Sequence, residues 1–176
     1  MIIVETHPST DMKLSAQVAT STVLLQIQPR QVRMDSKIRA TFKDPAPAYM
    51  ATFKQDNGKF ELRESENLID VHVGIDIRLF AVDKEHSDRE VQQDNWSVWI
   101  ELLFVLTYGL PPGQIPDEIK NAGFAAFSKL NARLACWPYI RHQANHLASE
   151  LGIPFVMPTL VLQASREAKP DSPSNP

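Results

Sequence analysis

The sequence predicts an α+β fold in which an antiparallel β-sheet of about four strands is covered on one face by a long kinked helix. Alternation of apolar and polar residues dominates the chain up to about residue 109, and helical periodicity follows it. Strands that come first and helices that come last do not form parallel βαβ units, so the helices are expected on one side of an antiparallel sheet. With 176 residues, the chain is long enough for one domain with its own core.

Three ranges divide the chain: a flexible N-terminal lead at 1–22, one domain at 23–162, and a proline- and serine-rich tail at 163–176 that is expected to be disordered. No apolar run reaches the roughly 18 residues of a membrane helix, and the N-terminus lacks the unbroken apolar core of a signal peptide. We therefore expect a cytoplasmic protein without membrane insertion. The net charge of -3 also argues against nucleic acid as a partner.

The strands are predicted in order from their local patterns. The first strand, at 23–28, runs into Pro29, which cannot donate to a ladder and so predicts an edge strand or a bulge. The Asn-Gly pair at 57–58 lies between two β-prone runs and predicts a hairpin. The clearest strand, at 69–79, alternates strictly between apolar and polar residues. The charged stretch at 82–95 is expected to be a mobile loop.

The last strand of the sheet differs from the others because both of its faces are apolar. One face is formed by Val98, Ile100, Leu102, Phe104 and Leu106. The other face carries Trp99, Leu103 and Val105 around Glu101. A strand of this kind either needs cover on both sides or presents apolar surface to a partner.

The helical cover follows from apolar residues three or four apart over 119–137, which predict one amphipathic helix. Pro138 lacks a backbone donor and costs about 3 kcal/mol inside a helix, so a kink or a restart is predicted there. A second stripe at 140–151 ends at Gly152, a suitable C-terminal cap. Prolines exclude helix from 153–162 and predict an extended apolar exit.

The sequence contains no phosphate-binding glycine motif, no GxSxG motif and no pair of cysteines spaced for metal. Cys136, the single cysteine, lies in an apolar segment, which favours a buried structural thiol over a nucleophile. His142, His146 and Glu150 have helical spacing that could hold a metal ion, although a solvated polar face is favoured. A metal-dependent enzyme that uses these three residues is therefore the least favoured hypothesis.

The segment from Leu130 to Leu162 resembles the SecB chaperone family, in which the main helix carries an aromatic-Pro-Tyr-x-Arg step before a proline-containing apolar exit. The residues at these positions are Trp137, Pro138, Tyr139 and Arg141. Weaker similarity extends upstream to Val23. The resemblance implies a homotetramer, built as a dimer of dimers, that holds unfolded polypeptides in apolar grooves without ATP, metal or enzymatic activity.

On this interpretation, apolar side chains near both ends of the resemblance contact the client, either unfolded preproteins or an antitoxin. These residues are Trp99, Leu103, Val105, Trp137, Tyr139, Phe155 and Met157. Glu101 is the candidate partner contact, although the acidic face that docks SecA in the export chaperones is otherwise missing. The usual final helix is also missing, as in solitary SecB-like chaperones of toxin–antitoxin systems. The alternative is a non-catalytic structural or adaptor subunit that uses the same surfaces as a permanent interface.

Overall fold

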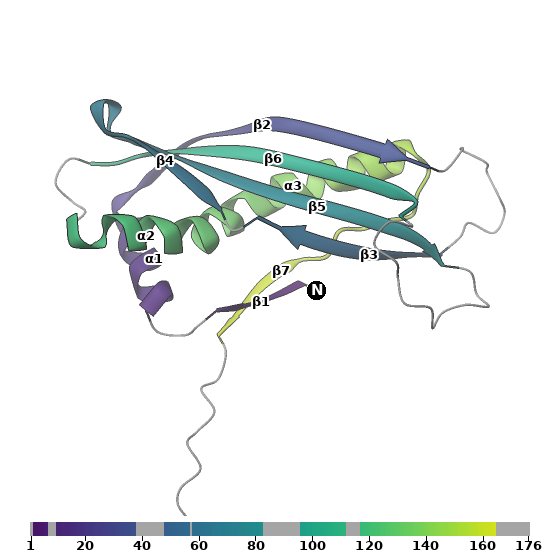
Figure 1. Ribbon diagram of the computed structural model, residues 1–176, viewed down its shortest axis with the longest axis horizontal. Coiled ribbons are helices and arrows are strands. Elements are labelled where there is room, and N and C mark those ends of the chain that lie inside the picture. Colours follow the sequence, from purple (N-terminus) through teal and green to yellow (C-terminus); the bar gives the residue numbers. More distant parts are fainter. Residues whose placement is uncertain are drawn as a thin grey trace, which may run out of the picture.

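The computed structural model describes residues 2–6, 10–37, 48–56, 58–82, 96–111 and 117–164, and it has the α+β architecture that the sequence predicts (Figure 1). Its main sheet is antiparallel and has five strands in the order β2-β6-β5-β3, with β4 also paired to β5. The strands are β2 (Val23–Ser36), β3 (Ala48–Gln55), β4 (Lys59–Arg63), β5 (Leu68–Val82) and β6 (Val98–Gly109). The helices α2 (Asp117–Lys129) and α3 (Asn131–Glu150) cover one face of this sheet.

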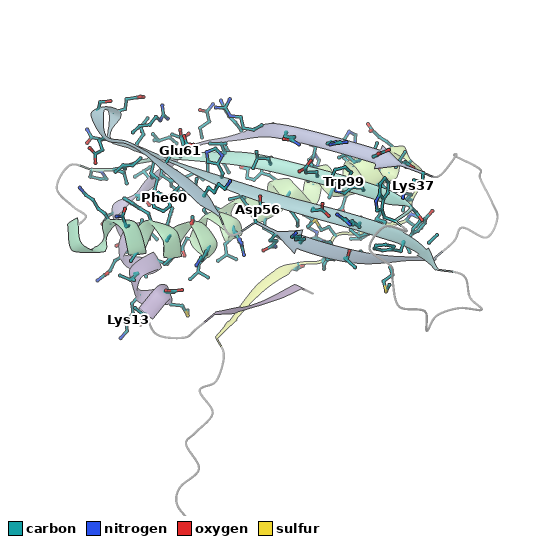
Figure 2. All side chains as sticks on the ribbon, in the orientation of Figure 1. Lys13, Lys37, Asp56, Phe60, Glu61 and Trp99 are labelled. Carbon is teal, nitrogen blue, oxygen red and sulfur yellow. The ribbon has the colours of Figure 1, made fainter. Side chains whose placement is uncertain are left out.

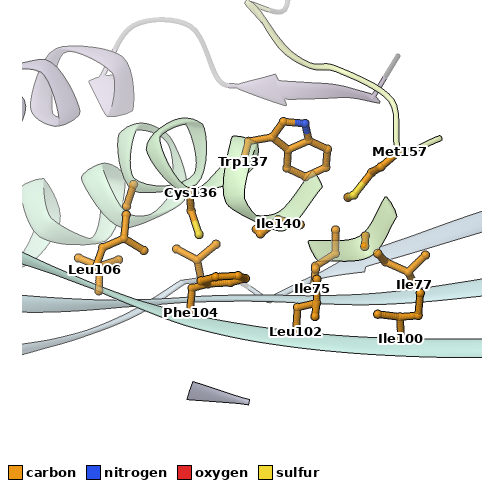
Figure 3. Packing of buried hydrophobic residues seen from close by; sticks show 14 of the residues in the cluster. Ile75, Ile77, Ile100, Leu102, Phe104, Leu106, Cys136, Trp137, Ile140 and Met157 are labelled. Atoms are coloured by element: carbon orange, nitrogen blue, oxygen red, sulfur yellow. The ribbon is translucent and has the colours of Figure 1, made fainter. Parts of the chain in front are cut away.

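The core lies between the helices and the apolar faces of β5 and β6. The alternate positions 69–79 of β5 and 98–106 of β6 are buried, as their period of two predicts. They pack against Cys136, Trp137 and Ile140 of α3 (Figure 3). The opposite face of the sheet, which we call the outer face, carries the polar members of the alternation.

β3 and β4, which lie on either side of the Asn-Gly pair, do not pair with each other as the predicted hairpin requires. β3 pairs with residues 75–82 of β5 and β4 pairs with residues 68–72, so the chain continues along the same neighbour across the break. The turn comes later, at the 3-10 helix η1 (Glu64–Glu66), which ends at Asn67 with φ of 53°. The hairpin prediction was wrong because Gly58 packs against the helix junction, as the next paragraph describes. This packing places the glycine in a bend between β3 and β4.

The break between β3 and β4 is occupied by the junction of the two helices. Gly58 has φ of +66°, and a Cβ added there would lie 3.1 Å from the Ser128 carbonyl oxygen. The guanidinium of Arg133 donates a hydrogen bond to the Asp56 carbonyl oxygen. Partial burial lowers the pKa of Arg133, and the nearby Asp56 carboxylate opposes this effect. The helix junction therefore fixes the bend in the sheet edge.

β2 is an edge strand that continues through Pro29. Its register against β6 shifts between Leu24 and Gln26 and again between Pro29 and Gln31. Both predictions from Pro29, an edge position and a bulge, are confirmed. Proline has no N–H to donate, and the bulge accommodates this within the ladder.

The break in the helical cover falls at Leu130, and α3 continues through Pro138. The prediction of a kinked helix is confirmed, but the helix does not restart at the proline. Pro138 and Leu134 both lie on the exposed side of α3. The Leu134 carbonyl that loses its helical donor therefore faces water, which lowers the cost of the proline.

The predicted N-terminal lead is corrected by the structure. Residues Thr10–Ser21 form α1, which packs against α2, and Val18 is fully buried. The buried Ser15 hydroxyl donates to Asn131 Oδ1 at 3.0 Å, which ties α1 to the start of α3. The sequence pattern did not predict α1, because only a narrow face of it, Ser15 and Val18, is buried.

The two ends of the described chain meet in a second, two-stranded sheet. β1 (Ile2–Thr6) pairs in parallel with β7 (Leu160–Ala164). The ribbon of β1 and β7 lies beyond β3 in Figure 1. Residues 163 and 164 of the predicted tail thus belong to β7, whereas 165–176 and the predicted loop at 83–95 lie outside the described residues.

Candidate functional site

The predicted contact residues do not form one surface. Trp99, Leu103 and Val105 lie on the outer face of the sheet, with Glu101 between them. Trp137, Phe155 and Met157 lie on the helix side and pack with or against the core. Tyr139 is on the exposed side of α3. Sequence spacing could not predict this separation, because it depends on which face of the sheet the helices cover.

On the outer face, Trp99 is half-buried and held by neighbouring strands. Its indole N–H donates to Asp76 Oδ2 at 2.7 Å, and the Arg33 guanidinium lies 4.6 Å from the centre of its ring. Trp96 has a similar cation–π contact, with Lys37 Nζ at 4.0 Å. Figure 2 places Trp99 and Lys37 towards the same end of the sheet. These contacts leave the Trp99 ring partly accessible but fix its orientation.

Charged residues of both signs lie around Glu101. Arg33 of β2 and Asp76 of β5 pair with Glu101 in the sheet register, and Gln31 Nε2 donates to Glu101 Oε2 at 2.8 Å. Arg78 Nε in turn donates to Asp76 Oδ1 at 3.1 Å. The outer face is therefore charge-balanced around Glu101, and it lacks the continuous acidic patch that a basic partner would need.

On the helix side, the extended segment 153–159 covers Trp137; we call this segment the strap. The Trp137 indole N–H donates to the Pro158 carbonyl oxygen at 3.1 Å, and the Met157 N–H donates to Asn145 Oδ1 at 2.7 Å. Trp137 is 5% exposed and Met157 is fully buried. Figure 3 shows Met157 reaching from the strap to the region of Ile75 and Ile77 on the sheet. These two predicted contact residues are core residues in this conformation.

The exposed side of α3 carries both apolar and polar groups. Tyr139 and Leu134 are exposed, at 52% and 41%. The rings of His142 and His146 are stacked with centroids 6.4 Å apart, and His146 Nε2 lies 3.3 Å from Glu150 Oε1. The described part of the chain contains no group of three His, Cys, Asp or Glu side chains that could hold a metal ion.

Cys136 is a fully buried free thiol. Burial raises the pKa of this thiol to about 12, so the neutral form persists at physiological pH. Burial also raises the pKa of Tyr108, and the nearby Cys136 adds to that shift. The prediction of a buried cysteine is confirmed.

The start of β2 forms an exposed apolar edge that was not predicted from the sequence. Val23, Leu24 and Leu25 are 60%, 41% and 59% exposed, and Val32 further along β2 is 44% exposed. On the strap, Val156 is 71% exposed. The run VLLQIQ beside Pro29 could have predicted this exposed edge. An apolar run in an edge strand has no neighbouring strand to cover it on one side.

No protein-family model matches the sequence, and no curated protein matches it. Solved structures do match: the Mycobacterium tuberculosis SecB-like chaperone Rv1957, in complex with a ChAD peptide from the Rv1956 HigA1 antitoxin, superposes with a TM-score of 0.63. The match covers 85% of this chain and 98% of that chain at 16% sequence identity. The fold is SecB-like. No helix among the described residues combines the length and apolar character that crossing a membrane requires.

The separated surfaces belong to one SecB-like fold. The sheet has an outer face, the helices lie on the other face, and the strap leaves α3 where the sequence predicted an extended apolar exit. Two further features of this chain are the docked α1 and the closing ribbon of β1 and β7.

Proposed function

We propose that this protein is an ATP-independent chaperone that holds unfolded or non-native polypeptides on apolar surface and delays their folding or aggregation. The observation that carries the proposal is the likeness of its fold to a SecB-like chaperone bound to an antitoxin peptide. Binding to the unfolded form of a client withdraws that form from folding by mass action. No cofactor or nucleotide is needed for this mechanism.

Exposed apolar side chains support the proposal. Leu25 on β2 and Tyr139 on α3 are each more than half exposed. Unfolded clients offer apolar side chains and unpaired backbone. The edge of β2 that pairs with no other described strand can bind both without strict sequence demand. Of the predicted contact residues, Trp99, Leu103 and Tyr139 are accessible to a client at least in part.

Two features favour a dedicated client such as an antitoxin over general export precursors. The neighbour of known structure holds an antitoxin peptide. On the outer face, Asp76 is paired with Arg78, and Arg33 lies opposite Glu101 in the sheet register, so basic residues interrupt the acidic surface that SecA would need. We propose a cytoplasmic homotetramer, built as a dimer of dimers, in which several weak contacts to one long client add as avidity.

The test is suppression of aggregation by the purified full-length chain. A reduced, unfolded protein is diluted into buffer with and without a near-stoichiometric amount of this chain, in the absence of ATP, and light scattering is recorded. We expect scattering to fall in proportion to the chaperone added. Unchanged scattering across this range would contradict the chaperone proposal. A folded protein of similar size serves as the control for crowding.

A structural or adaptor subunit is the second candidate function. The Trp99 ring on the outer face favours it, because a partly accessible aromatic side chain that is held in one orientation suits a permanent interface. Under this alternative, Trp99→Asp should break a permanent assembly, as measured by sedimentation. If the protein is a chaperone, Tyr139→Ser should weaken client binding and leave the assembly intact.

A further inference from the structure

The strap occupies its place in the manner of an extended peptide. Its burial alternates: Ile153 and Met157 are buried and Phe155 is half-buried, whereas Pro154, Val156 and Thr159 are exposed. The ring of Phe155 lies 6.3 Å from that of Phe53 on β3. An extended chain places every second side chain on the same side. The strap therefore inserts alternate apolar side chains between α3 and the β3 side of the sheet.

The hydrogen bonds that hold the strap along α3 engage its backbone. Going from the end of α3 back towards its start, Ile153 N–H donates to the Ala148 carbonyl, Met157 N–H to Asn145 Oδ1, and the Pro158 carbonyl accepts from Trp137. The strap thus runs antiparallel to α3. The Asn145 side chain accepts from a backbone N–H, and the Trp137 side chain donates to a backbone carbonyl. Any extended polypeptide offers both groups, provided that the residue opposite Asn145 is not proline.

We propose that the strap is a displaceable internal occupant of a client site. The site consists of Trp137 and Asn145 on α3 together with Phe53 on β3, and its client is an extended polypeptide segment with apolar side chains at alternate positions. The inference rests on the proposed chaperone function and adds the position and the client class. Client binding releases the strap, after which Asn145 and Trp137 hold the client's backbone instead.

The closing ribbon fits this device. The strap leads directly into β7, which pairs with β1, and an isolated two-stranded ribbon is marginally stable in water. Ribbon and strap can therefore open while the main sheet stays folded. If the open state has a population of about one in ten, weakening the strap tightens client binding by up to about tenfold, because apparent affinity scales with the competent fraction.

The first experiment weakens the strap without changing its site. Phe155→Ser combined with Met157→Ser removes inserted side chains, and Val156→Ser is the matched control because Val156 points to solvent. The probe is a synthetic peptide of the strap itself, GIPFVMPT, residues 152–159. We expect the double variant to bind this peptide about three- to tenfold more tightly than the wild type, and the control to match the wild type. Equal affinities for all three chains would overturn the proposal.

A second measurement uses the wild-type protein, in case the double variant does not fold. Each of the three tryptophans gives its own indole N–H signal in NMR. Excess peptide should shift the Trp137 signal and speed hydrogen exchange at the Met157 amide, while the Trp99 signal stays unchanged. Slower or unchanged exchange at Met157 would mean that the strap does not leave.

The two proposals fail separately. If the peptide displaces the strap at Trp137 but the protein does not suppress aggregation, the chaperone proposal is wrong and the displaceable strap is supported. Suppression of aggregation with an immobile Met157 amide would keep the chaperone and place its clients elsewhere, on the exposed edge of β2 or on the outer face.

Discussion

Single residues in this protein take their roles from depth in the fold more than from their chemistry. Trp137 and Trp99 are both indoles in apolar stretches, yet Trp137 is sealed beneath the strap while Trp99 is half-buried between Asp76 and Arg33. Cys136 lies beside Trp137 and is inert because it is buried. The same reasoning applies to Gly58, whose position opposite the helix junction decides the bend between β3 and β4.

Cys136→Ala should change how stability depends on alkaline pH. Burial raises the pKa of this thiol from 9.0 to about 12, so between these values the unfolded chain loses a proton that the folded chain keeps. Unfolding then releases protons, and the thiol makes stability fall as pH rises, by at most about 1.4 kcal/mol per pH unit. Urea unfolding of wild type and variant at pH 8 to 11 measures this. We expect the free energy of unfolding of the variant to increase relative to that of the wild type as the pH rises. The same pH dependence for both proteins would contradict this prediction.

Gly58→Ala should destabilise the protein by about 1–2 kcal/mol, the cost of a left-handed backbone for a residue with a Cβ. The new Cβ would also crowd the Ser128 carbonyl oxygen, a backbone atom that cannot move aside. Gly74→Ala is the matched control on β5, because its Cβ would meet only the flexible end of the Asp56 side chain. Chemical denaturation should rank the Gly58 variant as the less stable of the two; the reverse order would mean that the bend is not fixed by the helix junction.

At the scale of elements, α1 shows how a weakly patterned segment becomes part of the core. Its buried face is limited to Ser15 and Val18, but it approaches α2 closely at Gly123, where an added Cβ would lie 2.9 Å from Val18 Cγ2. The hydroxyl of Ser15 then joins α1 to Asn131 at the helix junction. A small residue on one helix and one buried side chain on the other are enough to dock it.

Gly123→Ala tests this contact, because the two physical effects have opposite signs. Helix propensity alone would stabilise the variant by about 1 kcal/mol, whereas overpacking against Val18 costs about 1–3 kcal/mol. We expect net destabilisation, and we expect Val18→Ala added to Gly123→Ala to cost less than the sum of the single changes. Urea unfolding of the four proteins in a double-mutant cycle measures the coupling. Strictly additive costs would show that α1 does not press on α2 at this point.

At the scale of the whole molecule, several exposed apolar side chains lie together on the edge strand β2. Among the described residues, β2 pairs with β6 on one side only, and its first three residues are exposed and apolar. An edge strand of this kind is a template for pairing with another chain. The molecule therefore offers association surface at the β2 edge, separate from the strap on the β3 side.

Leu25→Lys should reduce self-association, since a lysine on an edge strand opposes pairing with a second strand. Leu25 is 59% exposed, so the change should alter the unfolding midpoint little. Sedimentation velocity over a range of concentrations measures the assembly, and Thr52→Lys on the exposed outer side of β3 is the control. An unchanged sedimentation profile for Leu25→Lys would remove the β2 edge from the assembly.

The sequence by itself determined the elements whose burial follows a regular period. The alternation at 69–79 and 98–106 specified the inward faces of β5 and β6, and Pro29 predicted an edge position or a bulge, both of which the structure shows. These inferences held because a period of two assigns each side chain to one face whatever the partner strand is. The apolar exit after Gly152 was likewise extended, since its prolines exclude helix.

Only the tertiary structure decided what each face meets. The edge of the sheet bends between β3 and β4 because the helix junction packs against Gly58, and the N-terminal segment became α1 because Gly123 admits Val18. Trp137 and Met157 became core because the strap returns along α3 to Asn145. These are contacts between residues far apart in the chain, and local periodicity carries no information about them, because it assigns a side chain to a face and not to a neighbour.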